Sequence, residues 1–224
     1  MTSDAPVRPR RGRPKVEGLA DHRRTQIVEA AYAVLTEKGY DGTSIAEIAQ
    51  RAGIGQGTVY RYVNSKRELL DMVFDWSVER IFATIDPNEL LAAEAHTARD
   101  MAMHIKVIGD RLHRMVDEDP AILKLIGVQA SAIDKELKAR VVGLESMINS
   151  LVVRALTRAV ENGWFALTGP QRQIVARLLM MLALPGLVMS LRGDVDPGKR
   201  ERYVDAAADL AFHGMMKRPP TDGE

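Results

Sequence analysis

The sequence has no cysteine among its 224 residues. Disulfide bonds, thiolate ligands for zinc or iron–sulfur clusters, and cysteine nucleophiles are therefore excluded, and the composition suits a reducing compartment. No apolar run reaches the roughly 20 residues that cross a bilayer, and the longest, 178–191, contains Pro185 and Gly186. No apolar stretch follows the basic N-terminal residues as it would in a secretory signal. We therefore expect a cytoplasmic protein with no membrane partner.

The chain also has little net charge, +1 at pH 7, but that charge is unevenly distributed. Residues 1–67 contain 12 Lys or Arg against 7 Asp or Glu, whereas residues 68–224 contain 19 against 23. A basic N-terminal third either faces an anionic partner or is simply solvated.

Strand patterns are nearly missing, because strict alternation of apolar and polar residues is not found, whereas a 3.6-residue apolar period recurs from Ile27 onward. We therefore predict an all-α protein of about nine helices. The first is expected over about 22–38, with Gly39 as its left-handed stop. A long helix is expected over 65–85, started by Ser65 and Glu68 at capping-box spacing. Further helices are expected over about 97–116, 120–126, 134–162, 170–191 and 197–215.

Two short helices are predicted between the first helix and the long one. Ser44 and Glu47 have the spacing of a capping box, and Gly53 suits the positive φ that ends such a helix. The second short helix is predicted over 56–62, with Val59 and Val63 facing the first helix of the chain. Two short helices joined by a tight turn form a helix-turn-helix, whose second helix lies in the DNA major groove.

The residues themselves are more specific than their spacing. The segments TSIAEIA (43–49), AGIGQGTVYRYV (52–63) and SKRELL (65–70) closely resemble the DNA-binding domain of the TetR family of transcriptional regulators. The resemblance is dense over about 22–74, and it implies a three-helix DNA-binding domain over 21–67. Val63 departs from the phenylalanine usual in the family, but a valine still fills an apolar site.

The resemblance also indicates which residues face DNA. They are Ser44, Gln56, Gly57, Thr58, Tyr60, Arg61, Tyr62 and Lys66. Their chemistry fits, because glutamine pairs with adenine, arginine with guanine or phosphate, and threonine touches the thymine methyl group. The hydroxyl and ammonium groups of the others suit phosphates. For Tyr60 and Tyr62, the alternative to a DNA contact is partial burial against the core of the three-helix domain.

The arm over residues 1–20 is predicted to be disordered. Its segment 9–15 is similar to an AT-hook, in which arginines enter the narrow minor groove of A·T-rich DNA. The expected contacts are Arg10, Arg11 and Arg13. Nonspecific affinity for phosphates explains the same residues equally well.

Residues 68–216 are predicted to form a second helical domain, followed by a disordered tail over 217–224. The resemblance implies that this domain binds a small effector and dimerises, and 11 methionines in the chain favour a hydrophobic or aromatic effector. We expect effector contacts from Met101, His104, Ile105, Ile108, Val141, Leu144, Ile148, Trp164 and Met181. The expected dimer interface comprises Leu178, Leu182, Pro185, Met189, Tyr203, Ala207 and Leu210. Plain core packing is the alternative for both sets.

No catalytic or metal site is predicted. Asp100 and His104 are four residues apart but lack a third ligand, and the acidic run 117–119 is interpreted as a solvated loop and helix cap. No phosphate-binding glycine loop, nucleophile elbow or H-E-x-x-H motif is found, so we expect neither enzymatic activity nor a cofactor. The predicted function is a ligand-responsive regulator, typically a repressor, that binds a near-palindromic operator as a homodimer. An architectural DNA-binding protein without an effector is the alternative, and a helical enzyme acting on a lipid-like substrate is a third hypothesis.

Overall fold

The computed structural model describes residues 19–87, 96–126 and 134–191, with a few positions between 196 and 206; the side chains of Ala102 and of residues 182–191 are excepted. Arg10, Arg11 and Arg13 of the predicted arm lie outside this part of the chain. So does most of the helix expected over 197–215, including the interface candidates Tyr203, Ala207 and Leu210.

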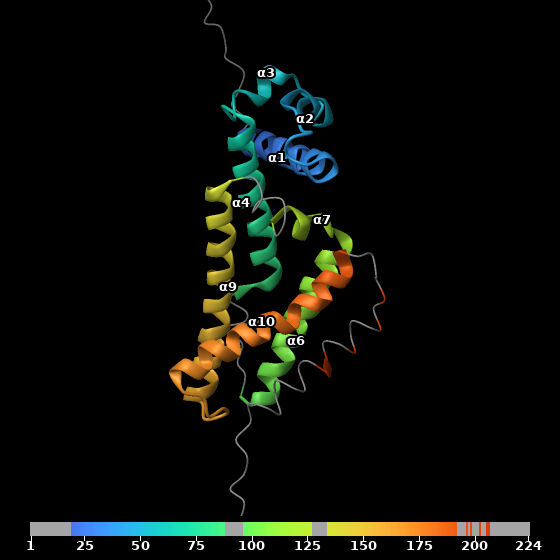
Figure 1. Ribbon diagram of the computed structural model, residues 1–224. Coiled ribbons are helices and arrows are strands. Elements are labelled where there is room, and N and C mark those ends of the chain that lie inside the picture. The colour runs from blue at the N-terminus through green and yellow to red at the C-terminus, as the bar shows by residue number, and fades with distance from the viewer. Residues whose placement is uncertain are drawn as a thin grey trace, which may run out of the picture.

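The described part of the chain is built from helices, as predicted (Figure 1). Three form a head at one end, and the long α4 leads from this head into a helical body. In the body, α9 lies beside α4, and α10 crosses α6. The helices are α1 (Leu19–Lys38), α2 (Ile45–Arg51), α3 (Gln56–Val59), α4 (Lys66–Ile85), α6 (Ala98–Glu118), α7 (Ala121–Leu123), α9 (Lys135–Glu161) and α10 (Gly169–Leu191).

Local sequence signals explain the head. Gly39 and Gly53 have φ values of +72° and +64°, the left-handed conformation that glycine adopts without strain and that was predicted at the ends of α1 and α2. The predicted capping box is present, because Ser44 Oγ accepts a hydrogen bond from Glu47 N (3.3 Å) and Glu47 Oε2 accepts one from Ser44 N (3.1 Å). Val59 and Val63 are no more than 1% exposed, so α3 is fixed by its apolar side.

Three predicted details were wrong. Helix α1 begins at Leu19 rather than near residue 22. Helix α3 ends at Val59 rather than Tyr62, because Arg61 N and Tyr62 N donate to carbonyls three residues earlier and tighten the chain into turns. At the start of α4, Ser65 Oγ accepts from Glu68 N (3.0 Å), but the Glu68 carboxylate accepts from the Asn64 N–H (2.7 Å) instead of completing the capping box.

The hydrophobic core of the head continues into the body. One buried cluster includes Ile27 of α1, Ile81 of α4, Met115 of α6 and Leu137 of α9. A second, smaller cluster lies where α6 begins and α9 ends, against the first half of α10. Because the buried face of α4 belongs to the shared cluster, head and body meet through packed side chains along this helix.

A polar cluster ties α1 to the body. The Tyr32 hydroxyl donates to Asp119 Oδ1 (2.6 Å), and Arg80 Nη1 donates to Asp119 Oδ2 (2.9 Å). Arg80 lies 4.7 Å from the ring of Trp76, which itself packs against Tyr32. Burial and the bond to Asp119 raise the pKa of Tyr32, so the hydroxyl stays a donor. The interpretation of Asp119 as part of a solvated loop was therefore wrong.

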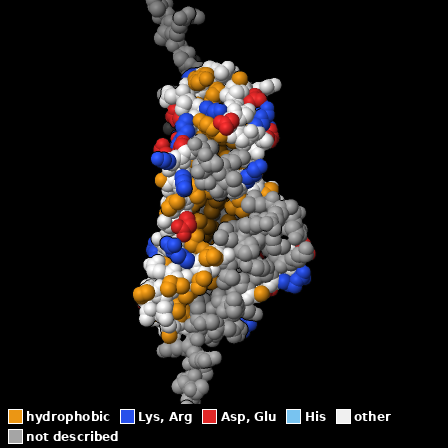
Figure 2. All heavy atoms as spheres, in the orientation of Figure 1, with side chains coloured by type: hydrophobic (Ala, Val, Ile, Leu, Met, Phe, Trp, Pro, Cys, Tyr) orange, Lys and Arg blue, Asp and Glu red, His pale blue; other side chains and the backbone are white. Residues whose placement is uncertain are grey.

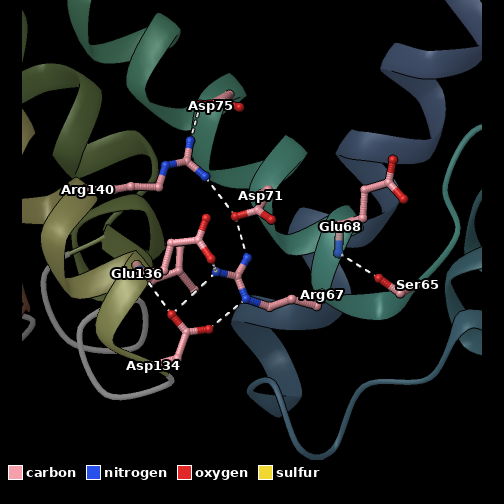
Figure 3. A network of polar contacts seen from close by, with 9 residues as sticks. Ser65, Arg67, Glu68, Asp71, Asp75, Asp134, Glu136 and Arg140 are labelled. Carbon is pink, nitrogen blue, oxygen red and sulfur yellow. Dashed lines mark hydrogen bonds and ion pairs between the residues drawn. The ribbon is translucent and has the colours of Figure 1, made fainter.

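A second polar cluster joins α4 to α9 (Figure 3). Arg67 Nε donates to Asp134 Oδ2 (2.6 Å), and Asp134 also caps α9 by accepting from Leu137 N (2.8 Å). Arg67 forms an ion pair with Asp71 on its own helix as well. From α9, Arg140 Nη1 donates to the same Asp71 (2.8 Å).

Two further contacts complete this cluster. Arg140 pairs with Asp75 one turn along α4, and its guanidinium lies 4.5 Å from the ring of Phe74. The side chains of Arg67 and Arg140 are only 25% and 26% exposed, so their pairs are less screened by water than ordinary surface pairs. Pairing with Asp71 and Asp134 raises the pKa of Arg67, while the Arg67 guanidinium holds the pKa of Asp134 below its usual value. The cluster fixes the head end of α4 against the first turns of α9.

The depressed pKa of Asp134 makes a prediction about acid stability. A carboxyl group with a lowered folded-state pKa stabilises the fold above its unfolded-state pKa, and that contribution is lost as the pH falls through the folded-state value. Asp134→Asn keeps a good helix cap but removes the charge. We expect it to lower the free energy of unfolding at neutral pH and to flatten the loss of stability in acid. Urea unfolding at a series of pH values tests this, and parallel profiles for the two proteins would contradict it.

Candidate nucleic-acid interface

The eight residues predicted to face DNA lie at the ends of three neighbouring helices of the head. Helix α3 lies at the end of the head farthest from the body (Figure 1). Gln56, Gly57, Tyr60 and Arg61, together with Ser44 at the start of α2, are exposed. Thr58, Tyr62 and Lys66 are half-buried.

Several of these side chains have no partner within the head. Among the described residues, the side chains of Gln56, Tyr60 and Arg61 make no hydrogen bond or ion pair, so their donors and acceptors remain available. Tyr60 is 50% exposed, although aromatic side chains are usually buried. A Cβ built at Gly57 would meet no atom within 4 Å, so packing within the protein does not require glycine there.

Other residues of this set have structural roles. Lys66 Nζ donates to the carbonyls of Tyr40 (2.8 Å) and Thr43 (3.1 Å), and lies 4.3 Å from the Tyr40 ring. It therefore ties the start of α4 to the loop between α1 and α2. Tyr62 packs against the core of the head, which agrees with the alternative of partial burial. Ser44 Oγ donates to Glu47 Oε2 (2.9 Å) while it caps α2.

The residues expected to contact an effector are not gathered around one described cavity. Met101 and Leu144 are buried in separate core clusters, and Ile108, Val141, Ile148 and Trp164 pack partly against these clusters. Ile105 and Met181 are 41% and 62% exposed. Within this set, the buried Nδ1 of His104 has no hydrogen-bond partner among the described residues, so it could bind a polar group of a ligand.

A groove of about 480 Å³ lies elsewhere, at the C-terminal end, or foot, of α4. Its described walls are Phe82 near the end of α4, Pro87 just after that helix, and Ser146, Met147, Ser150, Leu151 and Arg154 of α9. None of the seven is among the residues expected above to contact an effector, although Leu151 continues the apolar stripe through Leu144 and Ile148. The structure uses Leu144 and Ile148 for core packing.

An apolar stripe runs along the exposed side of α10. Ile174, Leu178 and Met181, spaced by about one turn each, are 60%, 52% and 62% exposed. Leu178 was predicted to lie in the dimer interface, whereas Met181 was assigned to the effector. Hydrophobic side chains also gather on the surface where α9 ends and α10 begins (Figure 2). The side chains of Leu182, Pro185 and Met189 lie outside the described part of the chain.

Asp100, four residues before His104, has a structural role at the start of α6. Asp100 completes a capping box at the start of α6, where its carboxylate accepts from Thr97 N (2.9 Å). The hydrogen bonds from Thr97 and His96 hold the pKa of Asp100 below its usual value. In the ranges that the structure describes, no three potential ligands come together around a metal position, and no helix is long and apolar enough to cross a membrane.

Comparison with known proteins supports the interpretation of the head. A sequence model of bacterial regulatory proteins of the tetR family matches residues 27–73, which include α2, α3 and the first turns of α4. The transcriptional repressor KstR of Mycobacterium tuberculosis, of the HTH type, is 27% identical over 164 residues, which make up 69% of this chain and 72% of that protein.

Solved structures have the same fold beyond the head. A putative TetR-family regulator from Mesorhizobium loti has a TM-score of 0.71 at 22% identity, over 90% of this chain and 100% of that one. The regulator FadR of Bacillus subtilis, in complex with stearoyl-CoA, has a TM-score of 0.68 at 18% identity, over 85% and 98%. The head of this chain therefore matches the tetR family of bacterial regulatory proteins over residues 27–73, and the chain has the fold of solved TetR-family regulators.

Proposed function

We propose that the protein is a repressor that binds a near-palindromic operator as a homodimer and is released by a small hydrophobic effector. The observation that carries this proposal is the group of exposed, unpartnered side chains on and just after α3, namely Gln56, Tyr60 and Arg61. Polar side chains at the free end of a helix-turn-helix are positioned to meet base edges and phosphates. The proposal includes no enzymatic step.

The chemistry of each position divides the proposed contacts between bases and backbone. Gln56, Thr58 and Arg61 contact base edges, and Gly57 lets the backbone approach the groove closely. Ser44, Tyr60, Tyr62 and Lys66 contact phosphates and set the register of the head on the duplex. Arg10, Arg11 and Arg13 add contacts in the neighbouring minor groove or with the phosphates.

The exposed apolar stripe on α10 supports the proposed homodimer. A side-by-side pair of α10 helices, completed by the last helix of each chain, would bury Leu178 and its neighbours and remove this apolar surface from water. Leu182, Pro185, Met189, Tyr203, Ala207 and Leu210 remain part of the proposed interface. The dimer would hold two copies of α3 about 34–36 Å apart, the spacing of successive major grooves.

The effector would act by favouring one orientation of the heads over another. A ligand shifts such an equilibrium only when it binds the two states with different affinity. The complex of FadR with stearoyl-CoA supports a hydrophobic effector in this fold. His104, with its buried unpartnered nitrogen, and the apolar residues Met101, Ile105, Ile108, Val141, Leu144, Ile148, Trp164 and Met181 remain candidate contacts.

The DNA contact is tested by selecting duplexes from a random pool with the purified full chain and then comparing variants on the selected sequence. Gln56→Ala should weaken binding to the selected duplex roughly 5- to 100-fold, because a bidentate base contact contributes about 1–3 kcal/mol. Binding to random duplex should be unchanged. Glu29→Ala, on the exposed side of α1, is the control. Equal affinity of the wild type and Gln56→Ala for the selected duplex would refute the assignment.

The dimer interface is tested by placing a charge in the stripe. Leu178→Glu should produce monomers in sedimentation experiments, because an unpaired carboxylate in an apolar interface costs several kilocalories per mole. Gln173→Glu places the same charge on an exposed polar position of α10 and should leave the dimer intact. A persistent dimer in Leu178→Glu would contradict the proposed interface.

A further inference from the structure

The groove at the foot of α4 combines apolar walls with one unpaired arginine, Arg154, among the residues that the structure describes. We propose that it binds a single-chain amphiphile with an anionic head group, such as a carboxylate or a phosphate monoester. Arg154 would contact the head group, and Phe82, Met147 and Leu151 would contact the chain. This inference rests on the proposed function only in treating the protein as responsive to a ligand.

The walls of the groove suit an alkyl chain. Phe82 of α4 and Pro87 just beyond it provide one side, and Met147 and Leu151 of α9 provide the other. Met147 is 57% exposed, which is unusual for a methionine in a helical body, so the groove leaves apolar surface to be covered. Methionine also adapts its shape to different apolar partners.

The charge of the groove selects the head group. Arg154 is exposed and forms no hydrogen bond or ion pair with any described residue, in contrast to the paired Arg67, Arg80 and Arg140. Among the lining residues that the structure describes, none is acidic. The Ser146 and Ser150 hydroxyls donate to the carbonyls of Val142 (2.9 Å) and Ser146 (2.8 Å), so they add polarity but no charge. An anionic group would gain a partner in Arg154, whereas a cationic one would be repelled.

The size of the groove fits a small molecule. Ligand pockets in proteins span roughly 300–1,000 Å³, and the groove has about 480 Å³. The described lining includes Phe82 of α4 and five residues of α9, so an occupant would contact both helices.

The position of the groove links it to the polar cluster of Figure 3. Phe82 lies two turns beyond Asp75 on α4, and Leu151 lies three turns beyond Arg140 on α9. Both helices that the Arg140 pairs hold together therefore also form the walls of the groove. An amphiphile that binds one separation of these helices more tightly would change the orientation of the head, which α4 carries.

The test is titration calorimetry of the full-length protein, free of DNA, with three ligands of the same chain length below their micelle concentrations. Dodecanoate and dodecyl phosphate should bind more tightly than dodecylammonium. Arg154→Gln should weaken binding of both anions about three- to tenfold and leave dodecylammonium unchanged or slightly tighter. Arg158→Gln removes an exposed arginine one turn farther along α9, outside the groove, and should bind all three as the wild type does.

A second variant separates the chain contact from the charge. Leu151→Ala should weaken binding of all three ligands, with an unchanged circular dichroism spectrum. Equal affinity of the wild type for dodecanoate and dodecylammonium, or equal losses in Arg154→Gln and Arg158→Gln, would overturn the proposal. So would a failure of the anions to bind. Sequence-specific DNA binding by the ligand-free protein is a separate measurement, so its failure would refute the proposed function and not this site.

Discussion

Arg67 and Arg140 pair across the boundary between α4 and α9, and the position of the head depends on these pairs. Arg67 lies in the first turn of α4, immediately after the helix-turn-helix, and it binds the residue that caps α9. Arg140 of α9 forms ion pairs with Asp71 and Asp75 of α4. We call these pairs between α4 and α9 the junction. Because removing one partner of a partly buried pair leaves the other charge unsatisfied, the pairs hold the two helices in one relative position. Tyr32 and Asp119 fix the opposite side of the head to α6.

The same junction explains how a site in the body would affect the DNA-facing surface. Helix α3 is only four residues long and is fixed by its buried Val59, so it moves with the head as a unit. The head in turn shares a core with α4. A change in the separation of α4 and α9 is therefore carried to Gln56 and Arg61 without any rearrangement within the head.

Local signals in the sequence were enough to predict most of the head. Gly39 and Gly53 end helices, Ser44 caps one, and Val59 and Val63 face the core, because each of these features depends on residues within a few positions. The junction could not be predicted in this way. Tyr32 and Asp119 are 87 positions apart, and Arg67 and Asp134 are 67 apart, so their pairing follows from topology alone. Periodicity likewise identified the buried face of α9, but it could not distinguish core packing at Leu144 from the wall of a groove at Leu151.

In the proposed dimer, the pairs between α4 and α9 and the α10 stripe together place two copies of α3 at one fixed spacing. The most direct measurement uses duplexes that carry two copies of the selected half-site with the distance between them varied one base pair at a time. We expect a single affinity maximum near one helical turn between half-site centres, about 10 base pairs. Uniform affinity across all spacings would show that the two heads are not held in register, and it would refute the proposed dimer.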